Sequence, residues 1–158
     1  MAIASEPLKI VDLLSPENIA LDTEVNTKSE LFTWCGDLFE RIYALNAQQV
    51  TAALRERERL GSTGLGYGIA VPHARLNRLS RTFAAFVRTR VPIPFDAPDG
   101  QPVTDLIVLV VPGHATEQHL QLLADAARLF GSKAFRDDMR TCTTPESLHQ
   151  SMMRHSSD

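Results

Sequence analysis

The segment that most constrains the fold is Asp105–Val111, in which six consecutive apolar residues, L-I-V-L-V-V, follow one aspartate. Branched aliphatic residues favour a strand, and Pro112 and Gly113 end it. A strand that is apolar at every position has both of its faces covered. The segment therefore predicts the central strand of a sheet that has helices on both sides.

Helical periodicity surrounds this strand. Thr27 is a helix cap, with Glu30 completing a capping box. The apolar face of that helix comprises Leu31, Phe32, Cys35, Leu38, Phe39 and Ile42. A second helix is predicted over Ala47–Arg57. After the central strand, Thr116 caps a helix that ends at Gly131, and two shorter helices follow, over 133–139 and from about 144. We assign the core face of the helix that begins at Thr116 to Leu120, Leu123, Ala127 and Phe130.

Further strands are predicted at Asn18–Val25, Gly68–Val71 and Thr82–Arg88, and Pro92–Phe95 is expected on an edge or in an irregular strand because it holds two prolines. The fold class is therefore α/β: a single-domain sandwich with a central mixed β-sheet flanked by helices. A length of 158 residues suits one domain, 1–158, which we expect to be ordered from about residue 7 to residue 154.

Charge and composition narrow the function. The formal net charge of −3 gives no support to nucleic-acid binding. Thirteen of the sixteen basic residues are arginine, and eight of these fall within 55–90, which indicates either a solvated basic face or a site for anions. Cys35 and Cys142 show no metal-type spacing and are expected to be reduced thiols. We find no membrane span or signal peptide, and we expect a cytoplasmic protein.

The run G-Y-G-I-A-V-P-H-A-R, 66–75, places His73 directly after a predicted strand. His119 follows the central strand in the same way, in the first turn of the next helix. Ligand sites of α/β sheets gather at the ends of strands. If these two strands run side by side and parallel, the two imidazoles lie close together.

Several interpretations of these histidines compete. A zinc site is disfavoured because His114 and His119 are five residues apart and no HExxH or CxxC motif is present. A Ser-His-Asp hydrolase could use Ser62 but lacks a G-x-S-x-G motif. His73 could also be only a polar residue at the end of a strand. The pattern favours phosphoryl transfer through His73, because a neutral imidazole is a nucleophile near pH 7.

The groups that stabilise a phosphoryl group are guanidinium, hydroxyl and helix N-terminal N–H groups. The residues placed to supply them are Arg57, Arg75, Ser62, Thr63 and the helix that carries His119.

The run R-E-R-L-G-S-T-G-L-G-Y-G-I-A-V-P-H-A-R, 57–75, resembles the active-site signature of enzyme IIA of the fructose/mannitol class of the bacterial phosphoenolpyruvate-dependent phosphotransferase system. P-I-P-F-D-A-P-D-G-Q-P-V, 92–103, resembles a second family segment, and D-L-I-V-L-V-V-P with E-Q-H-L-Q-L-L-A-D resembles a third. With no IIB, IIC or HPr-like segment attached, the chain is similar to the nitrogen-regulatory, PtsN-like type.

The resemblance implies that His73 is phosphorylated at Nε2, that His119 supports the phosphoryl group and that Arg57 stands beside the site. Ala74 departs from the glycine that the family often has after the histidine. The resemblance also implies a phosphorylated HPr-like carrier (NPr), itself charged by enzyme I, as the donor. Transporters or kinases are then the regulated partners, and no metal, other cofactor or membrane insertion is expected.

Other roles remain open. A sugar-specific enzyme IIA would pass its phosphoryl group to an enzyme IIB, and a pure binding module of the same fold would act without phosphorylation. Leu65, Tyr67 and Ile69 are candidates for an apolar rim on which the carrier docks, or for core residues, and Ile69 is the most core-like of the three.

Overall fold

The computed structural model describes residues 8–114 and 116–156. The side chain of Thr116, the predicted cap, and residue 7, at the expected start of order, lie outside the described residues. In chain order the elements are η1 (Ile10–Leu13), η2 (Pro16–Asn18), β1 (Ile19–Thr23), α1 (Lys28–Tyr43), α2 (Ala47–Arg59), β2 (Gly64–Gly66), β3 (Ile69–Ala70), β4 (His73–Leu76), β5 (Phe83–Ile93), β6 (Val103–Pro112), α3 (Thr116–Gly131), α4 (Lys133–Thr141) and α5 (Pro145–Ser156).

The strands form a mixed sheet with the order β1-β5-β6-β3-β2, and β4 also pairs with β6. β6 is antiparallel to β5 and parallel to both β3 and β4. β1 is parallel to β5, and β2 is antiparallel to β3. The predicted α/β class with a central mixed sheet is therefore confirmed, and so is the parallel pairing that brings the two histidines together.

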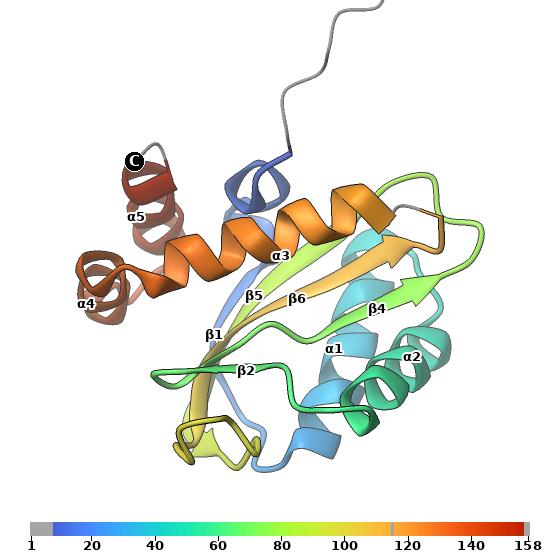
Figure 1. Cartoon of the computed structure of the whole chain (residues 1–158), viewed down its shortest axis with the longest axis horizontal. Coiled ribbons are helices and arrows are strands. Elements are labelled where there is room, and N and C mark those ends of the chain that lie inside the picture. Colours follow the sequence, from blue (N-terminus) through green and yellow to red (C-terminus); the bar gives the residue numbers. More distant parts are fainter. Residues whose placement is uncertain (1–7, 115, 157–158) are drawn as a thin grey trace, which may run out of the picture.

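Both faces of β6 are covered, as its unbroken apolar sequence predicts. Ile107, Leu109 and Val111 belong to a core shared with α3, α4 and α5. Leu106 and Val108 alternate with them and belong to a second core shared with α1 and α2. Figure 1 shows α3 crossing one face of the sheet while α1 and α2 lie on the other. The sheet is thus the middle layer between two sets of helices.

The start of α1 follows local chemistry. Thr27 Oγ1 accepts a hydrogen bond from Glu30 N at 3.1 Å, which confirms the predicted cap. The Glu30 carboxylate accepts from Asn26 N at 2.8 Å, one residue earlier than the ideal capping box. Two N–H groups at the helix start are satisfied in this way.

Two strand predictions need refinement. The strand predicted to end at Val71 ends at Ala70 as β3, and the chain pairs with β6 again as β4, so His73 lies beyond β3 and also begins the next strand. The irregular strand predicted at 92–95 is the end of β5, which continues to Ile93 and pairs with Val103 there after a shift of register. Pro92 is tolerated there because the last pair between β5 and β1 lies at Thr89, and the register with β6 is interrupted between Arg88 and Ile93.

The core face predicted for α3 is confirmed at Phe130, which is buried, and at Leu123, which packs against the core, but it is wrong at the other two positions. Leu120 is 61% exposed and Ala127 is exposed, whereas Leu122, Ala126 and Leu129 are buried. The buried His119 belongs to the inward face of this helix. Counting apolar residues alone left that imidazole out and rotated the predicted face toward Leu120.

Candidate functional site

His73 lies at the first position of β4, on a rigid part of the sheet. It pairs with Leu109 of β6, and Leu109 N donates to the Pro72 carbonyl at 3.0 Å. Within the described residues, β4 pairs with β6. Figure 1 shows β4 between α2 and α3. The His73 residue is 8% exposed. Its imidazole is therefore held at a fixed place between two helices.

Two hydrogen bonds define the protonation of the His73 imidazole. Nδ1 lies 2.8 Å from the Val71 carbonyl oxygen, which can only accept, so Nδ1 carries the proton. Arg57 Nε donates to Nε2 at 3.2 Å, so Nε2 presents its lone pair. Burial lowers the pKa of His73, and the charges of Arg57 and Arg75 lower it further, against the Val71 bond and Glu58. The ring is thus held neutral, with Nε2 as its nucleophilic atom.

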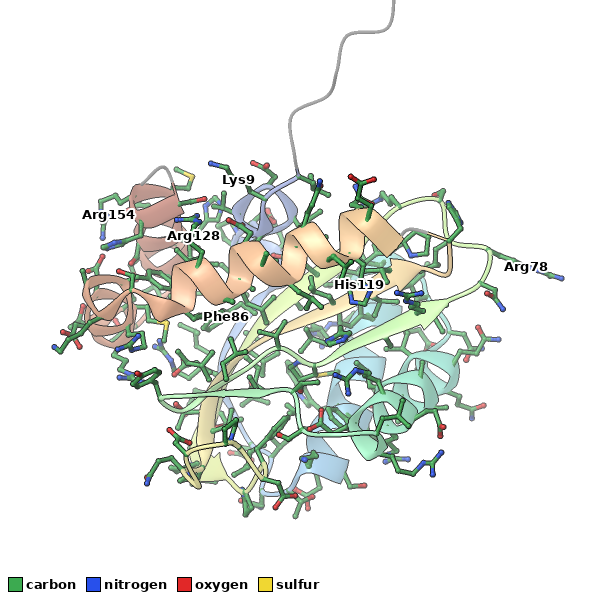
Figure 2. The ribbon with its side chains drawn as sticks, viewed as in Figure 1. Lys9, Arg78, Phe86, His119, Arg128 and Arg154 are labelled. Carbon is green, nitrogen blue, oxygen red and sulfur yellow. The ribbon has the colours of Figure 1, made fainter. Side chains whose placement is uncertain are left out.

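His119 supplies a second neutral imidazole. It projects from the side of α3 that faces the sheet (Figure 2), and its ring centroid is 4.8 Å from that of His73. Arg75 Nη2 donates to His119 Nδ1 at 3.3 Å, which leaves the proton on Nε2. Burial is the largest cause that lowers the pKa of His119 to about 4, followed by repulsion from His73 when that ring is protonated and by the charge of Arg75.

The Nε2 atom of His119 is buried and has no hydrogen-bond partner among the described residues. A buried N–H group without a partner costs about 1–3 kcal/mol, so native structures rarely keep one without a reason. A lone pair, an unused N–H donor and two guanidinium groups therefore lie within one small region. This combination suits a ligand that is both electrophilic and negatively charged.

The loop that contains Ser62 and Thr63 is held by its own hydroxyl groups. Ser62 Oγ donates to the Phe95 carbonyl at 2.6 Å and accepts from Gly64 N at 3.1 Å. Thr63 Oγ1 donates to Glu58 Oε1 at 2.6 Å. Both hydroxyl groups are thus engaged in holding the loop. Their predicted contact with a phosphoryl group stays a prediction.

The structure separates the three residues predicted to form a docking rim. Ile69 is fully buried, so the core interpretation holds for this residue. Tyr67 is 61% exposed in the turn between β2 and β3, where the Arg136 guanidinium lies 3.9 Å from the ring centroid. Leu65, in β2, is 40% exposed.

Tyr67 is far from His73 along the sheet. The Gly68 carbonyl, next to Tyr67, accepts from Asp105 N, whereas His73 pairs with Leu109. Four residues of β6 separate these two positions, which is about 13 Å. The turn that carries Tyr67 therefore does not border the two histidines.

Sequence reasoning missed three residues next to the site. Leu60, which caps the C-terminus of α2, is 75% exposed and adjoins Gly61, whose carbonyl accepts from Arg57 Nη1 at 2.9 Å. Leu120 is 61% exposed and follows His119. Glu58 is buried beside Arg57, and in the sequence it stands out only as a member of the run 57–75. The sequence carries no signal that Leu60 and Leu120 are exposed, because apolar periodicity alone places a leucine in the core.

Ala74, which stands where the family often has glycine, is 3% exposed in β4 and pairs with Val110. Its methyl group packs in the core shared with α1 and α2. An extended strand accepts alanine without strain. This substitution is therefore accommodated by the local backbone.

Residues 8–114 and 116–156 contain no group of three or more His, Cys, Asp or Glu side chains that could hold a metal ion. Across the same residues, no helix is both long enough and apolar enough to span a bilayer. Cys35 and Cys142 are buried free thiols, and burial raises the pKa of Cys35.

The candidate site is centred on two histidines of an open mixed sheet, and comparison with known proteins shows the family to which the chain belongs. Residues 12–154 match the family described as "Phosphoenolpyruvate-dependent sugar phosphotransferase system, EIIA 2", and the chain belongs to this family. The resemblance carried by 57–75 is thereby confirmed at the level of the family.

Similar proteins include nitrogen regulatory proteins and a sugar-specific component. A nitrogen regulatory protein of Pseudomonas aeruginosa is 36% identical over 144 residues, which cover 90% of this chain and 94% of that protein. The crystal structure of nitrogen regulatory protein IIA-Ntr from Neisseria meningitidis superposes with a TM-score of 0.85 at 41% identity, covering 90% of this chain and 98% of that one. A fructose-specific EIIA component of Haloferax volcanii is 34% identical over 122 residues, 77% of this chain and 75% of that protein.

Proposed function

We propose that the protein is a cytoplasmic phosphocarrier that accepts a phosphoryl group on His73 Nε2 from a phosphorylated HPr-like carrier of the NPr type. The observation that carries this proposal is the Nδ1 bond to the Val71 carbonyl at 2.8 Å, which leaves the Nε2 lone pair available next to His119. Family membership supports a phosphotransferase component. The reaction class is phosphoryl transfer between proteins.

In the proposed step, the Nε2 lone pair attacks phosphorus in line with the bond that joins it to the carrier. That bond breaks, and its electron pair stays on the carrier. No proton leaves His73, because Nε2 carries none and Nδ1–H remains bonded to Val71. Arg57 Nε must first leave Nε2, which it contacts at 3.2 Å in the free protein. We expect Arg57 then to bond the phosphoryl oxygens.

His119 is proposed to donate its free Nε2–H to a phosphoryl oxygen. Its pKa of about 4 keeps the ring neutral near pH 7, and the Arg75 contact to Nδ1 fixes which nitrogen carries the proton. Arg75 therefore orients His119 and also adds positive charge. Fixed donors of this kind, aimed at the charge of the transition state, typically supply more of the rate enhancement than any other single effect.

We infer that the carrier docks across the ends of α2 and α3, over a rim formed by Leu60, Leu120, Arg75 and Arg78. Leu60 and Leu120 are exposed apolar residues that adjoin the site from opposite helices. Arg75 and Arg78 are exposed, and Figure 2 shows Arg78 extending away from the body of the molecule after β4. This rim replaces the one predicted at Leu65, Tyr67 and Ile69.

The output is proposed to be mainly regulation of nitrogen or general metabolism. The phosphoryl group puts negative charge on a surface where a neutral imidazole stood, and this changes binding to a regulated transporter or kinase. The relatives named nitrogen regulatory proteins favour this role. The fructose-specific relative supports the alternative, transfer onward to an enzyme IIB for sugar uptake.

Phosphoryl uptake tests the proposal directly. The protein is mixed with phosphoenolpyruvate, enzyme I and the HPr-like carrier, and the intact mass is recorded. Wild-type protein and His114→Ala, which changes an exposed loop histidine, are expected to gain one phosphoryl group, and folded His73→Ala none. Uptake by His73→Ala at the wild-type rate would refute the site. No uptake by wild type would favour a pure binding module, and onward transfer to an enzyme IIB would favour the sugar role.

A further inference from the structure

Glu58 is a buried carboxylate that the proposed transfer chemistry does not use. It lies in the last turn of α2, directly after Arg57, and its side chain is 5% exposed. A carboxylate without partners at such a place would be strongly unfavourable. The hydrogen-bond partners of the Glu58 carboxylate therefore indicate its role.

Both carboxylate oxygens of Glu58 bind one residue of the active-site loop. Oε2 accepts from Thr63 N at 3.0 Å, and Oε1 accepts from Thr63 Oγ1 at 2.6 Å. Oε2 also accepts from Lys28 Nζ at 3.1 Å, which balances the charge from α1. This two-point contact fixes both the backbone and the side chain of Thr63.

From Thr63 the hydrogen bonds continue to the candidate nucleophile. Val71 N donates to the Thr63 carbonyl at 3.0 Å, and His73 Nδ1–H donates to the Val71 carbonyl at 2.8 Å. Each bond depends on the position of the residue before it. Glu58 thus lies at the start of a chain of contacts that ends on the imidazole.

We propose that Glu58 is a positioning residue for phosphoryl transfer: through Thr63 and Val71 it holds His73 with its proton on Nδ1 and its lone pair on Nε2. This inference rests on the proposed function for its effect on rate, but its effect on the tautomer of His73 is a property of the unphosphorylated protein. The negative charge of Glu58 also acts on His73, because it raises the pKa of that imidazole and so partly offsets the lowering by burial.

Glu58→Gln tests the proposal. The glutamine side chain has nearly the same shape but no charge, so its bonds to Thr63 lose the charge assistance of the carboxylate, and the ion pair with Lys28 is lost. Nitrogen-detected NMR of the unphosphorylated protein is expected to show His73 as a mixture of tautomers. The rate constant of phosphoryl uptake at saturating carrier is expected to fall about ten- to a hundredfold, while the KM for the carrier stays near wild type.

The matched control is Glu56→Gln, on the same helix. Its carboxylate is 63% exposed and pairs with Arg59, so both the tautomer and the rate are expected to stay at wild-type values. A wild-type tautomer and rate in Glu58→Gln would overturn the proposal. Failure of wild-type protein to take up a phosphoryl group would instead refute the proposed function, and the tautomer measurement would still test the role of Glu58.

Thr63→Val provides a second variant should Glu58→Gln not fold. It removes the hydroxyl donor to Oε1 and keeps the backbone contact to Oε2. A smaller change of tautomer in the same direction is expected. An unchanged His73 tautomer in folded Thr63→Val would also count against the proposal.

Discussion

At the scale of single residues, the site depends on two imidazoles that are kept neutral. His73 and His119 are nearly buried, and Arg57 and Arg75 each contact one ring nitrogen. Adding a proton to either ring would place a positive charge next to those guanidinium groups, without full hydration. The arginines thus favour the neutral rings in the free protein and become available to an anion when one arrives.

The depressed pKa of His119 predicts how stability depends on pH. Its folded value is about 4, against about 6.5 for ordinary histidine. Between these values the unfolded chain binds a proton that the folded chain does not, so the free energy of unfolding falls as pH falls. His119 contributes its full stability above about pH 6.5 and loses about 2–3 kcal/mol on the way to pH 4.5.

Urea unfolding at pH 7 and at pH 4.5 measures this loss in wild type and in His119→Asn. The difference in the free energy of unfolding between pH 7 and pH 4.5 is expected to be smaller in the variant than in wild type. Arg154 and Ser151 lower the pKa of Asp138 to about 2, so the stabilisation that Asp138 provides is lost mainly below pH 4.5. It therefore contributes little to the difference between pH 7 and pH 4.5. An equal pH difference in both proteins would contradict the environment assigned to His119.

The sequence predicted the centre of the site better than its surroundings. His73, His119 and Arg57 could be found because nucleophile, donor and cation are chemical types in a spaced pattern, and parallel strands then bring them together. The engagement of the Ser62 hydroxyl with the Phe95 carbonyl depends on a contact 33 residues away. No local pattern indicates whether such a hydroxyl is free.

At the scale of secondary-structure elements, α2 carries Arg57 and must be held closely to α1. Gly36 of α1 is the point of contact: a Cβ there would lie 2.1 Å from Thr51 Oγ1 and 2.6 Å from the Ala47 carbonyl oxygen. Only glycine allows the two helices to approach this far. The close approach fixes where the last turn of α2 meets His73.

Gly36→Ala is therefore expected to destabilise the protein by about 1–3 kcal/mol, because α2 has to move away from α1. The control is Gly131→Ala at the end of α3, where an added Cβ meets nothing within 4 Å. That variant is expected to be unchanged or slightly more stable. Thermal or urea unfolding of the three proteins measures the effect, and equal stability of Gly36→Ala and wild type would rule out the tight contact.

The elements themselves were largely predictable, because their apolar periods are clear. The helices over 28–43 and 47–59 and the central strand begin and end close to the predicted residues. The predictions that failed concern features set by contacts between residues far apart in the sequence. Pro72 signals an end of a strand locally, yet β6 continues past it and pairs again with the residues that follow. The inward face of α3 was set by burial of a polar imidazole, which apolar periodicity does not detect.

At the scale of the whole molecule, charge and apolar exposure are unevenly distributed. The chain has a net charge of −3, yet Arg57 and Arg75 contact the two histidines and Arg78 is exposed just after β4. Two exposed leucines, Leu60 and Leu120, adjoin that site. A basic rim with apolar points suits a partner that offers an acidic and apolar surface. Under the proposed function, changes at this rim are expected to alter association with the carrier and to leave the chemical step unchanged.

The double variant Leu60→Ser, Leu120→Ser tests this rim. Removing two apolar contacts is expected to raise the KM for the phosphorylated carrier about tenfold, at roughly 1.4 kcal/mol of lost binding, with little change at saturating carrier. The control is Met153→Ser on α5, 52% exposed and on the far side of the molecule from α2 in Figure 1. If the control raises the KM equally, or the double variant leaves it unchanged, the carrier docks elsewhere. The turn at Tyr67 would then be the surface to change next, because the Tyr67 ring is 61% exposed and is held in place by the Arg136 guanidinium that lies over it.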